Sequence, residues 1–227
     1  MNPALRRPGP PRGRPRSSEP PVGRAGVLRA ALQVFEQVGF EAATVRSIGA
    51  EAGVSAAALY IYFDGKEGLV LAACELKVTA LKARLGALEH EASGPMGHAF
   101  AILETTTAWA LQNLDVYELL LAGTGAQGSG KIWTLGRELD AACLRELEIA
   151  LVGFIGRSPD DCARIETGAR ALWAVANGVI CLCRRLDCPG AIGPLLSAAV
   201  APVLREIVTA EVDTVGAATP HRASSVH

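Results

Sequence analysis

Apolar side chains recur at helical spacing through most of this chain. From Leu28 to Phe35 they follow an i, i+3, i+4, i+7 series, which predicts an amphipathic helix over residues 24–38. Gly39 comes next and suits the position that ends a helix. Similar spacing, interrupted by Gly, Pro, Asp or Ser, predicts further helices over residues 44–51, 55–62, 65–90, 95–112, 114–122, 130–155, 160–186 and 190–212. No β-branched run alternates with polar residues, so the predicted fold is all-α.

Composition divides the chain into four segments. Residues 1–21 hold seven prolines and almost no large apolar side chain. They cannot bury enough surface to offset the entropy of ordering, so we expect a disordered basic arm. The helical patterns then form a short unit over 22–67 and a longer one over 68–212. Residues 213–227 are small and polar, which predicts a disordered tail.

Positive charge is concentrated at the amino-terminal end. Residues 1–29 carry seven arginines and one acid, a net charge of +6. The whole chain has a formal charge of −1, so the remainder carries −7. A basic arm on an acidic body predicts that one end of the protein meets a polyanion.

Within the arm, residues 11–15 read PRGRP, which resembles the core of an AT-hook. In that motif Arg-Gly-Arg lies along the narrow minor groove of A·T-rich DNA, whose negative potential attracts guanidinium groups. The alternative is that a segment rich in Arg, Gly and Pro produces such a pentad by chance. The predicted minor-groove contacts are Arg12, Arg14 and Arg16.

The stretch 44–66 carries the strongest local signal. Thr44 suits the N-cap of a short helix, and Gly53 suits the tight turn that follows it. Ser55 suits the N-cap of a second short helix, whose Leu59 is placed to pack back on the first. Two short helices joined by a Gly-containing turn form the helix-turn-helix pattern, in which the second helix enters the major groove of DNA.

This stretch, together with the helix before it, resembles the TetR family of bacterial transcription regulators. The residues that carry the resemblance are Phe35, Gly39, Phe40, Thr44, Val45, Ile48, Ala52, Gly53, Val54, Ser55, Leu59, Tyr60, Tyr62, Phe63, Lys66 and Glu67. The resemblance implies a homodimer in which each chain has an N-terminal helix-turn-helix domain and a larger C-terminal helical domain for ligand binding and dimerisation. It also implies phosphate contacts from Thr44, Tyr60, Tyr62 and Lys66.

The predicted contacts to a double-stranded DNA operator are polar or small side chains of this motif. Hydroxyl, phenol and ammonium groups are ordinary phosphate donors, and small side chains let the backbone approach the bases. Two alternatives stay open, namely that Thr44 acts only as a helix cap and that Tyr62 packs partly in the core. Beyond the arm, the predicted contacts are Thr44, Arg46, Ser55, Ala56, Ala57, Ala58, Tyr60, Tyr62 and Lys66.

Two features depart from what such a motif usually shows. Gly49 stands where Ala is common, and glycine costs roughly 1 kcal/mol inside a helix. The second helix reads SAAALYIY over residues 55–62 and has no Arg, Lys, Asn or Gln. The bidentate contacts that read guanine or adenine are therefore missing from it, and we expect sparse direct readout of the bases.

The resemblance also assigns roles within residues 68–212. It implies that Phe100, Trp109, Tyr117 and Trp133 surround a pocket for a small, mostly apolar ligand. The alternative is that these aromatic side chains simply fill the core. Helices 160–186 and 190–212 are expected to form a four-helix bundle across two subunits. The side chains expected in that interface are Ile165, Leu172, Ile180, Leu195, Val203 and Ile207.

Three of the six cysteines cluster at Cys181, Cys183 and Cys188. If the first two share a helix they point about 200° apart, and Cys188 would lie about 10 Å along the helix from Cys181, too far for a disulfide. We interpret the cysteines as small core side chains. A thiol sensor and a zinc site remain alternatives.

These observations predict a ligand-responsive, sequence-specific DNA-binding transcriptional regulator, a repressor released by a small apolar molecule. We expect a cytoplasmic protein without contact to a membrane, because no run of 18 apolar residues and no signal-peptide segment is present. No catalytic constellation, metal site or cofactor motif stands out. The rivals are an enzyme and an architectural protein that coats DNA through its basic arm without sequence preference.

Overall fold

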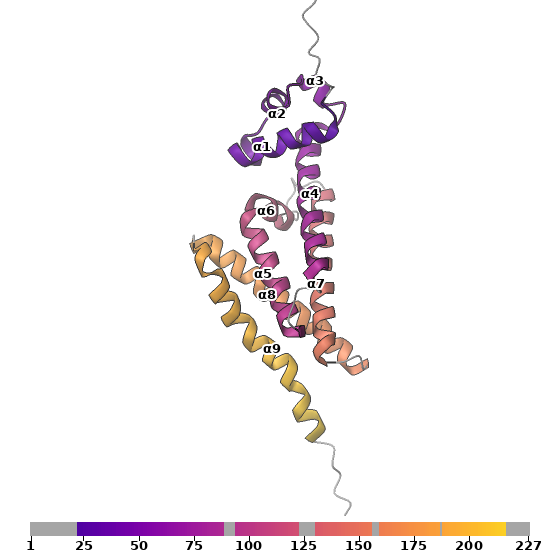
Figure 1. Ribbon diagram of the computed structural model, residues 1–227, viewed down its shortest axis with the longest axis vertical. Coiled ribbons are helices and arrows are strands. Elements are labelled where there is room, and N and C mark those ends of the chain that lie inside the picture. The colour runs from indigo at the N-terminus through magenta and orange to yellow at the C-terminus, as the bar shows by residue number, and fades with distance from the viewer. Residues whose placement is uncertain (1–21, 89–93, 123–129, 156–158, 187, 217–227) are drawn as a thin grey trace, which may run out of the picture.

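The computed structural model describes residues 22–88, 94–122, 130–155, 159–186 and 188–216, and every regular element in these ranges is helical. Figure 1 shows a small cluster of helices at one end of an elongated molecule, joined by one long helix to a larger helical body. The cluster and its connecting helix are α1 (Arg24–Ala42), α2 (Val45–Glu51), α3 (Ala56–Leu59) and α4 (Gly65–Ala87). The body contains α5 (Gly94–Gln112), α6 (Leu114–Ala122), α7 (Gly130–Ile155), α8 (Pro159–Leu186), the 3-10 turn η2 (Pro189–Ala191) and α9 (Ile192–Gly216).

The all-α prediction is confirmed for the described part of the chain. The predicted arm, residues 1–21, and the end of the predicted tail, residues 217–227, lie outside it. Helix α9 continues to Gly216, past its predicted end at residue 212. No helix within the described ranges is both long and apolar enough to cross a membrane.

Helix α1 stops its regular course at Gly39, as predicted. Gly39 has φ 77° and ψ 167°, which only glycine adopts without strain, and one further turn follows to Ala42. The rings of Phe35 and Phe40 meet edge to face across this break, with 4.7 Å between their centroids. An apolar contact across a glycine stop fixes the direction in which the chain leaves the helix. Here it directs the chain into α2.

Helix α2 packs so closely on the turn before α3 that only glycine fits at position 49. A Cβ atom built on Gly49 would lie 2.9 Å from the carbonyl oxygen of Val54, and the Val54 N–H donates to the Gly49 carbonyl at 2.9 Å. The side chains of Ile48 and Leu59 are fully buried in the core next to this contact. The low helix propensity of Gly49 is therefore offset by a close approach between the two helices of the motif.

Helix α5 is the centre of the body, because it packs against α4, α6, α7, α8 and α9. Its Ile102 and Leu103 are fully buried, as are Leu147 and Leu151 of α7 and Leu172 of α8. Full burial of one such side chain contributes about 1.5–3 kcal/mol. The body is thus held mainly by a continuous apolar core.

A chain of polar side chains crosses this core between α6, α7 and α8. Tyr117 Oη donates to Asn177 Oδ1, Asn177 Nδ2 donates to the carbonyl oxygen of Trp173 at 2.8 Å, and Trp173 Nε1 donates to Asp140 Oδ1 at 3.2 Å. Burial raises the pKa of the Tyr117 phenol. Burial also raises the pKa of the Asp140 carboxyl, against the opposing effect of the hydrogen bond from Trp173. The network attaches α6 to α8 inside the body.

Three residues predicted for the subunit interface lie instead in the core of the protomer. Ile165, Leu172 and Ile180 are 6%, 0% and 1% exposed, because they lie on the side of α8 that its neighbours cover. They leave no surface for a partner, so the predicted interface is corrected at these positions. The other three predicted residues are half-buried and pack against the same core: Leu195, Val203 and Ile207.

Replacing Gly49 by alanine should destabilise the protein, although alanine favours helices by roughly 1 kcal/mol over glycine. The new methyl group meets a backbone oxygen that cannot rotate away, and overpacking costs about 1–3 kcal/mol. We expect a net loss of about 1 kcal/mol in denaturant unfolding. The matched control is Gly86→Ala on α4, an exposed position with no atom near the missing Cβ, which should keep or raise stability. Equal stability of Gly49→Ala and the wild type would contradict the close contact.

Candidate DNA-binding surface

Two reciprocal hydrogen bonds hold the start of α2. The backbone N–H of Ser47 donates to Thr44 Oγ1 at 3.0 Å, and the backbone N–H of Thr44 donates to Ser47 Oγ at 3.0 Å. This is a capping box, and both residues are exposed. The predicted cap at Thr44 is confirmed. Ser47 was missed because a capping box usually carries Glu or Gln in its place.

One cap and one buried side chain position α3. Ser55 Oγ accepts a hydrogen bond from the backbone N–H of Ala58 at 3.1 Å, which confirms the predicted cap. Leu59 is fully buried and faces the core of the small cluster. Ala58 is half-buried, so it lies at the edge of the exposed face.

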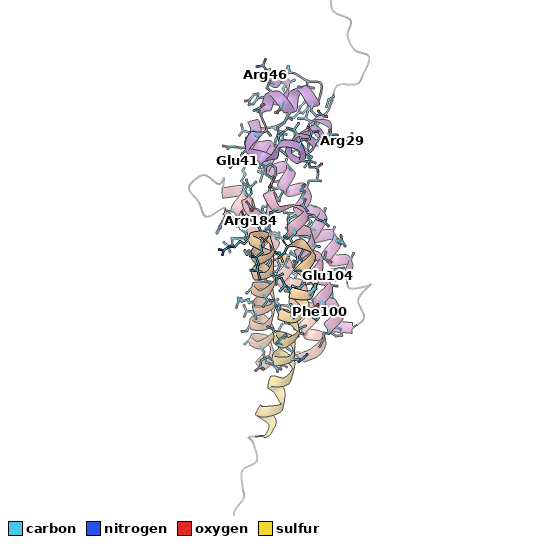
Figure 2. The ribbon with its side chains drawn as sticks, turned by 90° about the vertical axis from the view of Figure 1, so that its left-hand side faces the viewer. Arg29, Glu41, Arg46, Phe100, Glu104 and Arg184 are labelled. Carbon is cyan, nitrogen blue, oxygen red and sulfur yellow. The ribbon has the colours of Figure 1, made fainter. Side chains whose placement is uncertain are left out.

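The outer face of α3 and the residues after it is open to solvent. Ala56 and Ala57 are exposed, and Tyr60 and Ile61 are 60% and 78% exposed. Arg46 of α2 is exposed as well, and Figure 2 shows it at the far end of the small cluster, away from the body. These five residues, which we call the tip surface, present small, phenolic, aliphatic and cationic groups.

Lys66 and Tyr62 are less open than the tip surface. Lys66 Nζ donates to the carbonyl oxygen of Glu41 at 2.7 Å, which ties the start of α4 to the end of α1. An ammonium group has three donors, so two remain for a phosphate. Tyr62 is half-buried and packs against the core, as the alternative interpretation of that residue expected.

The first described residues show where the arm joins the fold. Val22 packs against the core, and the guanidinium group of Arg24 lies over the ring of Phe63, 4.6 Å from its centroid. Phe63 lies between α3 and α4, so the first described residues pack on the same small cluster that carries the tip surface. Three predicted DNA contacts lie outside the described residues: Arg12, Arg14 and Arg16.

The four aromatic residues predicted to line a ligand pocket do not all lie in one enclosed site. Phe100 and Trp109 are half-buried and pack against the core, and Tyr117 is buried. Trp133 is 40% exposed, with the guanidinium group of Arg137 4.9 Å from its ring centroid. Trp133 therefore lies at the surface of α7, and its place in a ligand pocket stays a prediction.

A cleft of about 280 Å³ lies where the small cluster meets the body. Phe35 and Phe40 of the α1 break line it together with Leu111, which comes from the end of α5. Lys77 and Asp115 are among its polar residues. Sequence reasoning missed this cleft because α1 and α4 supply part of its walls, and both lie far along the chain from α5 and α6.

Comparison with known proteins explains this arrangement. The sequence model of the family of bacterial regulatory proteins called the tetR family matches residues 27–73, from α1 into α4. The HTH-type transcriptional regulator BetI of Agrobacterium fabrum is 30% identical over 171 residues, which cover 70% of this chain and 76% of that protein. The chain belongs to the TetR family of bacterial transcriptional regulators. The predicted resemblance is thereby confirmed.

Two further relatives of this TetR-family chain are informative. The regulator BetI 2 of Chromohalobacter salexigens is 35% identical over 92 residues, 40% of this chain and 44% of that protein. The crystal structure of FadR from Bacillus subtilis in complex with stearoyl-CoA has the same fold, with a TM-score of 0.58 at 15% identity over 82% of this chain and 98% of that one. The chain spans less than half the length of two of the curated relatives that it matches.

Replacing Thr44 by aspartate should separate its two predicted roles. Aspartate caps a helix at least as well as threonine, so stability should stay within about 0.5 kcal/mol of the wild type. If Thr44 also contacts a phosphate, the added negative charge should weaken DNA binding by about 1.5–3 kcal/mol, measured by fluorescence anisotropy with a labelled duplex. Thr44→Ser keeps both the cap and the hydroxyl and is the matched control. Unchanged affinity in Thr44→Asp would mean that Thr44 is only a cap.

Proposed function

We propose that this TetR-family protein is a homodimeric repressor that binds a DNA operator and leaves it when a small, mostly apolar molecule binds its body. The proposal rests on the way α3 is held against the cluster while its outer face stays open to solvent. Buried Leu59 and the Ser55 cap hold the helix from behind, while Ala56, Ala57 and Tyr60 face solvent. A second helix presented in this way fits the major groove. The family resemblance favours repression over activation.

Contacts to phosphates would hold the motif on DNA. The Thr44 hydroxyl, the exposed Arg46, the Tyr60 phenol and the two remaining Lys66 donors are the groups available for this role. Such contacts carry no sequence information. Residues 56–58 offer methyl groups to thymine but no bidentate hydrogen bonds, so discrimination by α3 alone would be modest.

The basic arm is proposed as the second source of affinity and sequence preference. Its PRGRP segment at residues 11–15 has the composition that follows a narrow A·T-rich minor groove. The arm enters the fold at Val22 and Arg24, on the cluster that carries the tip surface. From there it would reach the minor groove next to the major groove that α3 occupies, as homeodomain arms do.

A second copy of the chain is proposed to pack on the exposed side of α8 and α9. On α8 this side carries Ala174 and Gly178, followed by Leu182, which is 43% exposed. On α9, which packs beside α8, Ala198 is exposed. Small side chains allow helices to approach closely, and Leu182 adds apolar area to an interface. These exposed residues replace the buried ones first predicted for the interface.

The ligand is proposed to bind within the body. FadR from Bacillus subtilis was solved with stearoyl-CoA, a molecule with a long apolar chain, so this fold accommodates such ligands. Here α5 carries the half-buried Phe100 and Trp109. It also carries His98 Nε2 and Thr107 Oγ1, which are buried without a hydrogen-bond partner among the described residues. A mostly apolar ligand with few polar groups would satisfy them.

Selection from random DNA duplexes tests the function directly. We expect the full chain to enrich an inverted repeat, since two symmetric subunits read two half-sites. Ala57→Glu places a negative charge on the tip surface and should weaken binding to that repeat by about 1–3 kcal/mol. Ala83→Glu makes the same change at an exposed position near the end of α4 that lies far from α3, and it should bind normally. Binding without any enriched sequence would favour the architectural alternative.

Deleting residues 1–18 should weaken operator binding and flatten its salt dependence. The slope of log K against log salt should fall by roughly 0.9 for each DNA phosphate that the truncated protein no longer neutralises. Preference for A·T pairs beside the half-sites should relax as well. The measurement is a salt titration of full-length and truncated protein on operators with A·T or G·C flanks. Identical slopes and identical flank preference would mean that the arm does not touch DNA.

A further inference from the structure

Two cysteines meet where α8 ends. The backbone N–H of Cys188 donates to the carbonyl oxygen of Cys183 at 3.1 Å. A hydrogen bond over this spacing belongs to the Schellman pattern of helix termination, in which the side chains of the two bonded residues frequently contact each other. In most helices that contact is between apolar side chains, whereas here both partners are thiols.

The two thiols differ in their access to solvent. Cys183 is 2% exposed and belongs to the core, whereas Cys188 is half-buried and packs against that core. After burial, interaction with the neighbouring Cys188 thiol is the next cause that raises the pKa of Cys183. Cys181 is exposed, on another side of the helix. If α8 continued as a straight helix, Cys188 would lie away from Cys181 and Cys183. Because α8 ends at Leu186, the chain turns and brings Cys188 back onto Cys183.

We propose that Cys183 and Cys188 form a redox-active dithiol, a modification site that hydrogen peroxide converts into an intramolecular disulfide. The backbone hydrogen bond at 3.1 Å holds the two residues next to each other, as a disulfide requires. The site is independent of the proposed DNA and ligand contacts. It is assigned to the turn between α8 and η2.

The accessible Cys188 is the sulfur that the oxidant reaches first. Its thiolate attacks one peroxide oxygen and the O–O bond breaks, which gives a sulfenic acid. The other oxygen takes up the proton that the Cys188 thiol released and leaves as water. The Cys183 sulfur then attacks the sulfenic sulfur, the S–O bond breaks, and the second oxygen leaves as water with the thiol proton. Two sulfurs are oxidised, and one peroxide is reduced to two waters. Burial raises the pKa of Cys183, so its sulfur reacts second, after the more accessible Cys188 has been oxidised.

The sequence allows the product to be identified directly. Arg184 and Arg185 lie between the two cysteines, so trypsin separates them into peptides 171–184 and 186–205. Full-length reduced protein is treated with equimolar hydrogen peroxide, alkylated, digested and analysed by mass spectrometry without reductant. We expect these two peptides to be joined by a disulfide that dithiothreitol removes. Because Cys181 shares a peptide with Cys183, the Cys181→Ser variant is included and should give the same joined pair.

Three results decide the proposal. The joined peptides should be absent from Cys183→Ser and Cys188→Ser. The oxidised wild type should melt a few degrees above the reduced form, because a cross-link restricts the unfolded chain, and Cys188→Ser should show no such rise. Separate, alkylated peptides at a peroxide dose that oxidises Cys181 would overturn the proposal. A disulfide that disappears in Cys181→Ser would overturn it as well.

Discussion

A helix of four residues cannot hold itself together, and the DNA-binding end of this protein is organised around that constraint. Isolated helices shorter than about 12–15 residues are marginal in water, and α3 runs only from Ala56 to Leu59. Burial of Leu59, the Ser55 cap and the close approach of α2 at Gly49 supply the missing stability. All three act from behind or from the ends of the helix. The outer face of α3 is therefore not needed to hold the helix in place, and it is available to a binding partner.

The same constraint explains how the small cluster is attached to the rest of the chain. The break at Gly39 turns the chain into α2, and Lys66 at the start of α4 bonds to the carbonyl oxygen of Glu41 just after that break. Arg24 lies over Phe63 on the same cluster. The ends of α1 and the start of α4 are thus held together, so the orientation of α4 sets the orientation of the tip surface relative to the body (Figure 1).

Local signals in the sequence predicted most of the fold, because helix stops and caps depend on neighbouring residues. Gly39, Thr44 and Ser55 act where the pattern placed them. Predictions that depend on which surfaces meet were less successful. Helical spacing identified the apolar face of α8 but not the helices that cover it, so Leu172 was assigned to a partner instead of the core. The contact of Cys183 with Cys188 likewise required the position at which α8 ends.

Helix α6 is attached to α8 within the body by two contacts of unequal strength. Arg184 of α8 bonds to Glu118 of α6 at 2.6 Å, but this ion pair is exposed, and such pairs contribute about 0–1 kcal/mol. The partly buried bond between Tyr117 and Asn177 is costlier to break, because a buried polar group left without its partner costs about 1–3 kcal/mol. A displacement of α8 must therefore break that bond or carry α6 with it. Residues of α6 and residues 38–42 at the end of α1 line one groove, so a displacement of α6 would change the shape of that groove beside the helix-turn-helix.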